Sequence, residues 1–242
     1  MNTLQDTVRA LYNGEYACLY PAARWLEYAE GAPRLCSAKE MLQKRQDVQT
    51  QIVSSDRISD RLATVSVEYR LDGAWHADVV GAIRTGNWQI VCITSSSMPL
   101  RLNNLSDAPS NYQTAAVGEI SALVLDYCHQ VYLMDADACL TRCFWPQTRM
   151  YHPDASEDSF SDVEIQVLYQ RWTGTPDPAA LGLFEFSRIY DIRLLSSDTA
   201  VVKIGCAKLD CFFQDYLTAM IVDEKWRLVN KMTHCIHTGP RI

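Results

Sequence analysis

Residues 209–232, LDCFFQDYLTAMIVDEKWRLVNKM, decide the fold that the sequence predicts. Two apolar runs, Phe212–Val222 and Trp226–Met232, flank the polar segment Asp223-Glu224-Lys225. That segment is short enough to be a hairpin loop, and the second run alternates in character as a strand does. The stretch therefore predicts two antiparallel strands joined by a tight turn.

The same pattern occurs once before in the chain. Residues 71–94, LDGAWHADVVGAIRTGNWQIVCIT, align with 209–232 without a gap at an offset of 138, so that Trp88 falls on Trp226 and Ile83 on Ile221. Because the matches keep their order at one offset, they predict a duplicated unit of roughly 110–130 residues, the usual size of a domain.

Composition limits the classes of function. The 242 residues are 48% hydrophobic and 21% charged, which suits one large or two ordinary globular domains. A net charge of −7 and the lack of a basic cluster argue against nucleic-acid binding. No apolar run approaches the roughly 20 residues of a membrane span, and the polar N-terminus does not resemble a signal peptide. The nine cysteines form no C-x-x-C pair, so we expect reduced thiols in a cytoplasmic protein.

Helical spacing followed by strand patterns predicts an α+β order in the first half, residues 1–98. We expect helices at Thr3–Tyr12, at Tyr16–Tyr20 and, from an S-x-x-E capping box, at Ser37–Arg45. The expected strands are Ile52–Val53, Ala63–Tyr69, Leu71–Ile83 and Asn87–Thr94. Residues 99–116, rich in Ser, Asn and Pro, are the predicted linker.

The second half, residues 117–242, repeats this order. A helical stripe runs from Ile120 to Val131, a second helix starts at Asp137–Leu140, and a second capping box at Ser161–Glu164 predicts a third helix. Strands follow at Phe186–Leu194 and Ala200–Cys206, before the hairpin.

Three segments of the second half resemble the nuclear-transport-factor-2-like superfamily, in particular its SnoaL-like and lumazine-binding-like members. They are Met150–Ala155 (MYHPDA), Phe213–Leu217 (FQDYL) and Glu224–Lys231 (EKWRLVNK). The first half departs from the pattern, because Trp25–Ala29 stands where the H-P-D-A turn should be. We therefore expect the first domain to be degenerate.

The resemblance implies two tandem cone-shaped domains, each with helices packed in a strongly curved antiparallel sheet of cystatin-like type, and a pocket at the wide end. It also implies contact between the two domains as an internal pseudo-dimer. Dimerisation between chains stays an open alternative.

Asp215 is the candidate catalytic residue. It lies between Phe213 and Leu217, which share its strand face. If that face lines the cone, burial raises the pKa of the carboxyl group and suits it to proton transfer, as in the ketosteroid isomerases of this superfamily. The alternative is a carboxylate that points outward or pairs with an arginine. Ala77 aligns with Asp215, so the first half is expected to lack this acid.

His234 shares its strand parity with Trp226 and could form an acid–base pair with Asp215, or it could be a plain strand-end histidine. The candidate ligand-binding residues are Tyr132, Trp145, Tyr151, His152, Phe213 and Leu217. Each has an ordinary alternative: the aromatic residues as core, and His152 as part of a structural turn.

The sequence predicts neither a metal nor a cofactor. No H-x-H, H-x-x-x-H or H-E-x-x-H occurs, nor a G-x-G-x-x-G or a P-loop. Two functions remain. One is a small-molecule-binding protein with a hydrophobic pocket in the second domain. The other is a cofactor-independent isomerase, dehydratase or cyclase that acts on a small apolar or polyketide-like substrate. The few ionisable groups expected in the pocket favour binding.

Overall fold

A computed structural model describes residues 3–45, 48–96, 110–156, 158–172, 174–182, 185–208 and 211–237, with the side chains of 110–113 and 237 excepted. These residues form two compact units. The first contains the described residues up to 96, together with His152–Ser161 and Leu195–Asp198, and the second contains the rest. Over the described ranges, no helix is both long enough and apolar enough to cross a membrane.

The first unit is built on a six-stranded mixed sheet in the order β2-β1-β6-β5-β4-β3. Its helices are α1 (Leu4–Tyr12), the 3-10 helix η1 (Tyr16–Cys18) and α2 (Ala38–Gln43). Its strands are β1 (Leu19–Ala29), β2 (Ala32–Ser37), β3 (Thr50–Ser59), β4 (Leu62–Leu71), β5 (Ala74–Thr85) and β6 (Asn87–Ser96). Strand β6 returns beside β1 in the same direction, so one strand pair is parallel in a sheet predicted to be antiparallel throughout.

The second sheet repeats this topology in the order β8-β7-β12-β11-β10-β9, again with one parallel pair, β7 and β12. Its helices are α3 (Ser110–Leu133), α4 (Ala136–Ala138), the π-helical turn η3 (Cys139–Cys143) and α5 (Ile165–Gln170). Its strands are β7 (Phe144–Pro153), β8 (Phe160–Glu164), β9 (Ser187–Leu194), β10 (Thr199–Lys208), β11 (Cys211–Val222) and β12 (Lys225–His237). The predicted fold class is confirmed: the chain contains two tandem copies of one α+β fold.

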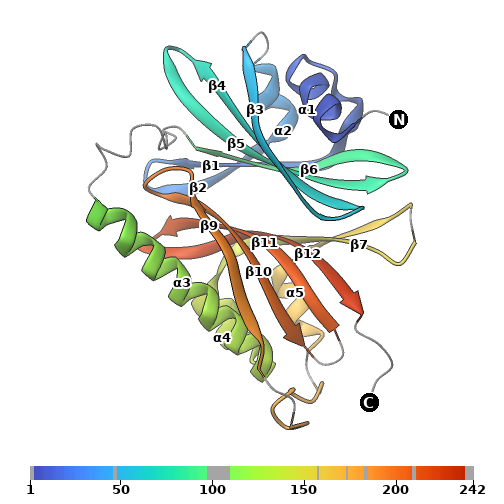
Figure 1. Cartoon of the computed structure of the whole chain (residues 1–242), viewed down its shortest axis with the longest axis vertical. Helices are drawn as coiled ribbons and strands as arrows, with labels where there is room; N and C mark the ends of the chain where they lie inside the picture. Colours follow the sequence, from blue (N-terminus) through green and yellow to red (C-terminus); the bar gives the residue numbers. More distant parts are fainter. Residues whose placement is uncertain are drawn as a thin grey trace. The chain divides into compact units, whose positions relative to one another are not determined.

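In each unit the helices cover one face of the sheet, and the apolar core lies between them (Figure 1). The stripe predicted for α3 is the buried one, with Ile120, Val124, Tyr127 and Val131 facing the sheet. Because neighbouring strand residues point to opposite faces, every second residue of β10 joins the same core, from Ala200 to Cys206.

A β-bulge occurs at the same place in both copies. Gly81 pairs with Cys92 and Ala82 pairs with Ile90, so one residue of β6, Val91, has no partner in this register. The register between β11 and β12 shifts in the same way, from Thr218–Asn230 to Ala219–Leu228, around Val229. Each bulge reverses the face to which the following residues of the last strand point.

The register corrects the predicted alignment of the two halves. Val67 pairs with Asp78 in the first sheet, and Ile204 pairs with Asp215 in the second, so β4 and β5 match β10 and β11 at an offset of 137. The offset of 138 holds only from Trp88 onward, because the loop after β11 is one residue longer than the loop after β5. The counterpart of Asp215 is therefore Asp78, and the expectation that the first half lacks this acid is wrong.

Two of the predicted helix starts agree with the structure and one does not. Thr3 and Asp6 form a capping box at α1, and the Ser37 hydroxyl caps α2. Ser161, in contrast, lies in β8, where its hydroxyl donates to Asp154, and α5 begins only at Ile165. The S-x-x-E pattern is local, and here the pairing of β8 with β7 determines the backbone instead.

Two further boundaries differ from the prediction. The short helix expected at Tyr16–Tyr20 is a 3-10 turn that ends at Cys18, and Pro21 lies within β1, where the register with β6 is interrupted and a missing N–H is tolerated. Helix α3 already starts at Ser110, so the last seven residues of the predicted linker 99–116 are helical, and the others lie outside the described residues.

Candidate functional site

A buried carboxylate with three hydrogen-bond donors lies at the centre of the second unit. Asp215 on β11 has no exposed surface. One oxygen, Oδ2, accepts from the Tyr127 hydroxyl at 3.0 Å and pairs with the Lys231 ammonium at 2.5 Å. The other oxygen accepts from the Thr233 hydroxyl, directly across on β12. Both carboxylate oxygens therefore have donors, and the charge has a partner.

The Lys231 ammonium belongs to this cluster as closely as the carboxylate does. It also donates to the Tyr127 hydroxyl and lies 5.0 Å from the centre of that ring. Burial and the charge of Asp215 together hold the pKa of Tyr127 well above its usual range, so the phenol stays a donor. If β12 alternated regularly from Trp226 onward, Lys231 would lie on the face opposite Trp226. The bulge at Val229 shifts the alternation by one residue and turns Lys231 inward.

The first unit contains the corresponding cluster around Asp78, which is also fully buried. The Tyr12 hydroxyl donates to Oδ2, and the Tyr69 hydroxyl donates to Oδ1 at 3.1 Å. Ser95 lies across on β6 and also bonds the carboxyl group. The Arg45 guanidinium donates to the Tyr69 hydroxyl at 2.8 Å, so Tyr69 lies between this cation and the carboxyl group of Asp78.

The two clusters share a tyrosine of the first helix, a strand aspartate and a strand hydroxyl, and they differ in the cation. Lys231 touches its carboxylate, whereas no direct Arg45–Asp78 bond is found in the described part of the chain. Burial consequently dominates at Asp78 and raises the pKa of that carboxyl to about 6.

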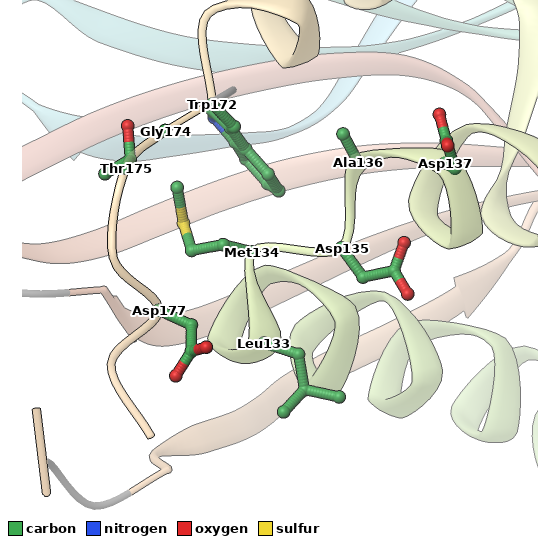
Figure 2. A pocket seen from close by; sticks show the side chains of 9 residues that line it. All are labelled: Leu133, Met134, Asp135, Ala136, Asp137, Trp172, Gly174, Thr175 and Asp177. Atoms are coloured by element: carbon green, nitrogen blue, oxygen red, sulfur yellow. The ribbon is translucent and has the colours of Figure 1, made fainter. Parts of the chain in front are cut away.

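An open pocket of about 380 Å³ lies in the second unit where α3 ends (Figure 2). It is lined by Leu133, Met134, Asp135, Ala136, Asp137, Trp172, Gly174, Thr175 and Asp177. In Figure 2 the indole of Trp172 is seen between the side chains of Met134 and Ala136. The pocket thus combines an apolar part with three carboxylates.

Two of these carboxylates are held in place by local backbone. Asp135 is the N-cap of α4 and accepts from the amide of Ala138 at 2.9 Å. Asp177 accepts from the amide of Ala180 in the loop that follows α5. Such short-range caps fix one carboxylate oxygen and leave the other available to a ligand.

Aromatic side chains separate the pocket from the buried carboxylate. Trp172 contacts Tyr169 with ring centres 4.1 Å apart, Tyr169 contacts Phe144 at 5.7 Å, and Phe144 contacts Tyr127 at 5.3 Å. These four aromatic rings fill the interior between the pocket and the buried carboxylate, and Asp215 is therefore absent from the pocket lining.

The structure brings three of the residues singled out from the sequence together. Phe213 and Leu217 pack against the core on the same face as Asp215, as the alternation predicted. His234 pairs with Gln214, whereas Asp215 pairs with Thr233. Neighbouring residues point to opposite faces, so the register does not bring His234 to Asp215.

The other candidate ligand-binding residues lie apart from the described pocket. Tyr132 is half-buried on α3, with its ring 6.5 Å from that of His129. Trp145 is half-buried and Tyr151 fully buried on β7. His152 is half-buried near the end of β7, where its ring bonds the carbonyl of Pro153 at 3.2 Å. None of the ligand-binding residues predicted from the sequence lines the pocket, which depends on how a helix end meets a distant loop.

The described histidine, cysteine and acidic residues do not form a metal site. Among the residues that the structure describes, no group of three histidine, cysteine or acidic side chains converges as a metal site would require. All nine cysteines are free thiols.

Residues 115–234 match the family model described as "Putative lumazine-binding". The second unit is a domain of this family. The match covers the helix that carries Tyr127 and every strand of the buried cluster, and it agrees with the resemblance found in the sequence.

Several solved structures are similar to about half of the chain. A nuclear-transport-factor-2-like protein of unknown function from Silicibacter pomeroyi is 17% identical, with 51% of this chain and 98% of that one covered and a TM-score of 0.45. A second such protein, from Shewanella baltica, is 18% identical over 52% and 97% of the two chains, with a TM-score of 0.45. A putative scytalone dehydratase from Novosphingobium aromaticivorans is 14% identical over 55% and 93%, with a TM-score of 0.40. No curated protein matches the chain.

Proposed function

We propose that the lumazine-binding-family domain binds a small molecule in the pocket at the end of α3. The observation that carries this proposal is the pocket itself, about 380 Å³, which is lined by Trp172, Met134 and three carboxylates. A cavity of a few hundred cubic ångströms with an apolar wall and a few polar groups is typical of small-molecule sites.

The charges of the lining indicate the class of ligand. Asp135, Asp137 and Asp177 line the pocket, and no lysine or arginine is among the described residues of its lining. An anionic ligand would be repelled, whereas a neutral molecule with N–H groups or a small cation would find acceptors. The name of the matched family adds lumazine, a planar heterocycle, as the first compound to test.

Acid–base catalysis by Asp215 and His234, the alternative function, has less support. A catalytic base must reach the proton that it removes. Asp215 has no exposed surface and three donors, and His234 belongs to the other face of the sheet. The cluster suits a structural role, so we propose a binding domain rather than an enzyme.

A thermal-shift measurement with a matched pair of compounds tests the proposal. Benzamidine and benzoate are alike in size and opposite in charge. We expect lumazine or benzamidine to raise the melting temperature and benzoate to leave it unchanged, since a ligand at 100 times its dissociation constant stabilises the folded state by about 2.7 kcal/mol.

Two variants place the binding at the pocket. Thr175→Trp fills it from the loop side and should abolish the shift. Ala115→Trp is the control, because Ala115 is exposed on α3, roughly 27 Å along the helix from Leu133. If no planar neutral or cationic compound stabilises the protein, or if the shift persists in Thr175→Trp, the pocket is not the binding site.

A further inference from the structure

Lys208 lies at the pocket end of the second unit, and none of the described residues pairs with its ammonium as a counter-ion. It is the last residue of β10 and is half-buried. Its ammonium lies 4.1 Å from the ring centre of Trp172, the indole that lines the pocket. Within the described ranges, the amine has no hydrogen-bond acceptor and no carboxylate at ion-pair distance, and it packs over the indole ring of Trp172.

This environment favours the neutral amine. Burial is the larger cause and the positive charge of Lys231 is the next, and together they lower the pKa of Lys208 to about 8. The thiols of Cys206, Cys139 and Cys211 act in the opposite direction, with less effect. At pH 7 about a tenth of such an amine is unprotonated, against roughly one in a few thousand for an exposed lysine. Only the unprotonated amine is a nucleophile.

We propose that Lys208 is a reactive amine beside the pocket that forms an imine with small neutral or cationic aldehydes. The proposal rests on the proposed function in one respect, because the aldehyde reaches the lysine through the same pocket. The four-carbon stem of the lysine lets the amine move past the edge of Trp172 to a carbonyl carbon held there.

The reaction balances without an oxidant or a metal. The nitrogen lone pair of Lys208 attacks the carbonyl carbon, and a C–N bond forms as the C=O π electrons move to oxygen. A proton passes from nitrogen to that oxygen, which gives the carbinolamine. The C–O bond then breaks, water leaves with its second proton from the nitrogen, and a C=N bond remains.

Reductive trapping of the full chain tests this assignment. The protein is incubated with benzaldehyde and sodium cyanoborohydride at pH 7, where hydride from the reductant converts an imine into a stable benzyl amine. Peptide mapping by mass spectrometry then compares Lys208 with Lys225, an exposed lysine of the β11–β12 turn. We expect Lys208 to be labelled about tenfold more than Lys225, with the advantage declining as pH rises above 8 and the other lysines lose their protons.

Two variants complete the test. Lys208→Arg keeps the positive charge over Trp172 and should remove the label from this peptide only. Thr175→Trp blocks the pocket and should abolish the preference for Lys208. Equal labelling of Lys208 and Lys225 overturns the proposal, and so does selective labelling that Thr175→Trp leaves unchanged. Reversible binding without labelling would leave the proposed function standing and remove only the imine, since the thermal-shift measurement needs no covalent step.

Discussion

Asp78 and Asp215 occupy equivalent positions in the two sheets, and each is fully buried opposite a hydroxyl residue of the last strand. Both accept from a tyrosine of the first helix of their unit, Tyr12 or Tyr127. Duplicated interior polar groups with complete hydrogen bonding are expected to hold a core in one arrangement. The buried aspartate therefore has a structural role in both units. A function specific to the second unit is to be sought at its pocket.

Replacement of Asp215 by Asn should destabilise the second unit by about 3–5 kcal/mol, because it leaves the Lys231 ammonium buried without its counter-ion. Urea unfolding, with hydrogen exchange of β10–β12 peptides to locate the effect, is the measurement. Asp60→Asn removes an exposed carboxylate and should change the stability by less than about 0.5 kcal/mol. A loss below about 1 kcal/mol would show that the ion pair contributes little.

The double variant Asp215→Leu with Lys231→Met distinguishes the contribution of the two charges to stability from the contribution of the volume that the side chains fill. Buried ion pairs are often replaced by apolar residues of similar volume at no net cost. We expect the double variant to be more stable than either single one, by about 2 kcal/mol. An additive loss in the double variant would contradict this and would assign the effect to packing.

The stability of the first unit should depend on the ionisation of Asp78. Its pKa in the folded protein, about 6, is raised above the ordinary value of 3.8, because burial disfavours the charged form. The folded state therefore binds this proton more tightly than the unfolded state. The resulting stabilisation is complete below pH 3.8 and is lost as the pH rises through 6, a change of about 2 kcal/mol between pH 4 and pH 7.

The variant Asp78→Asn cannot titrate, and it should lack this part of the pH dependence. Urea unfolding of both proteins between pH 4 and pH 7 gives the comparison, with Asp60→Asn as the control that keeps the wild-type profile. Parallel profiles of wild type and Asp78→Asn would mean that the carboxyl group is ionised equally in the folded and unfolded states.

The matching tyrosines should each stabilise their own unit. Tyr12→Phe and Tyr127→Phe remove a donor to a buried carboxylate, and we expect each to cost about 1.5–3 kcal/mol. Hydrogen exchange should rise in β4–β6 peptides for the first variant and in β10–β12 peptides for the second. Tyr190→Phe, at an exposed ring on β9, is the control with little expected effect. Equal exchange in all peptides would show that the hydroxyls are not coupled to the acids.

Much of the fold could be predicted because its signals are local. The β11–β12 hairpin and the stripe on α3 follow from the periodicity of neighbouring residues. Strands β1 and β7 were missed. Each pairs in parallel with a strand far along the chain, β6 or β12, although β1 also forms a hairpin with β2 through Glu30-Gly31. Parallel partners of this kind leave no turn signal beside the strand.

The candidate site could be predicted only up to the first irregularity. Two-residue alternation placed Phe213, Asp215 and Leu217 on one face, where the structure has them. One extra residue at Val229 reverses the faces of all residues that follow it, so alternation counted from Trp226 does not place Lys231 on the inner face. A bulge has no distinct composition, and its position emerges only from the pairing with the neighbouring strand.

Two of the hairpin loops, β4–β5 in the first sheet and β11–β12 in the second, differ at a residue that should affect stability. Asp72-Gly73 and Asp223-Glu224 are both two-residue loops, and all four residues have positive φ. Glycine accepts this conformation freely, whereas a side chain costs about 1–2 kcal/mol there. Glu224, at φ 63°, is the second residue of the β11–β12 loop, as Gly73, at φ 81°, is of the β4–β5 loop.

Glu224→Gly should therefore stabilise the second unit by about 0.5–1 kcal/mol, after the greater flexibility of glycine in the unfolded chain is subtracted. The opposite substitution in the β4–β5 loop, Gly73→Glu, should destabilise the first unit by a similar amount, since it puts a side chain at the same left-handed place of a two-residue loop. Urea midpoints at constant m-value are the measurement. If Glu224→Gly lowers the midpoint, the glutamate side chain stabilises the turn by more than its backbone conformation costs, and the left-handed residues of this loop are not a source of strain.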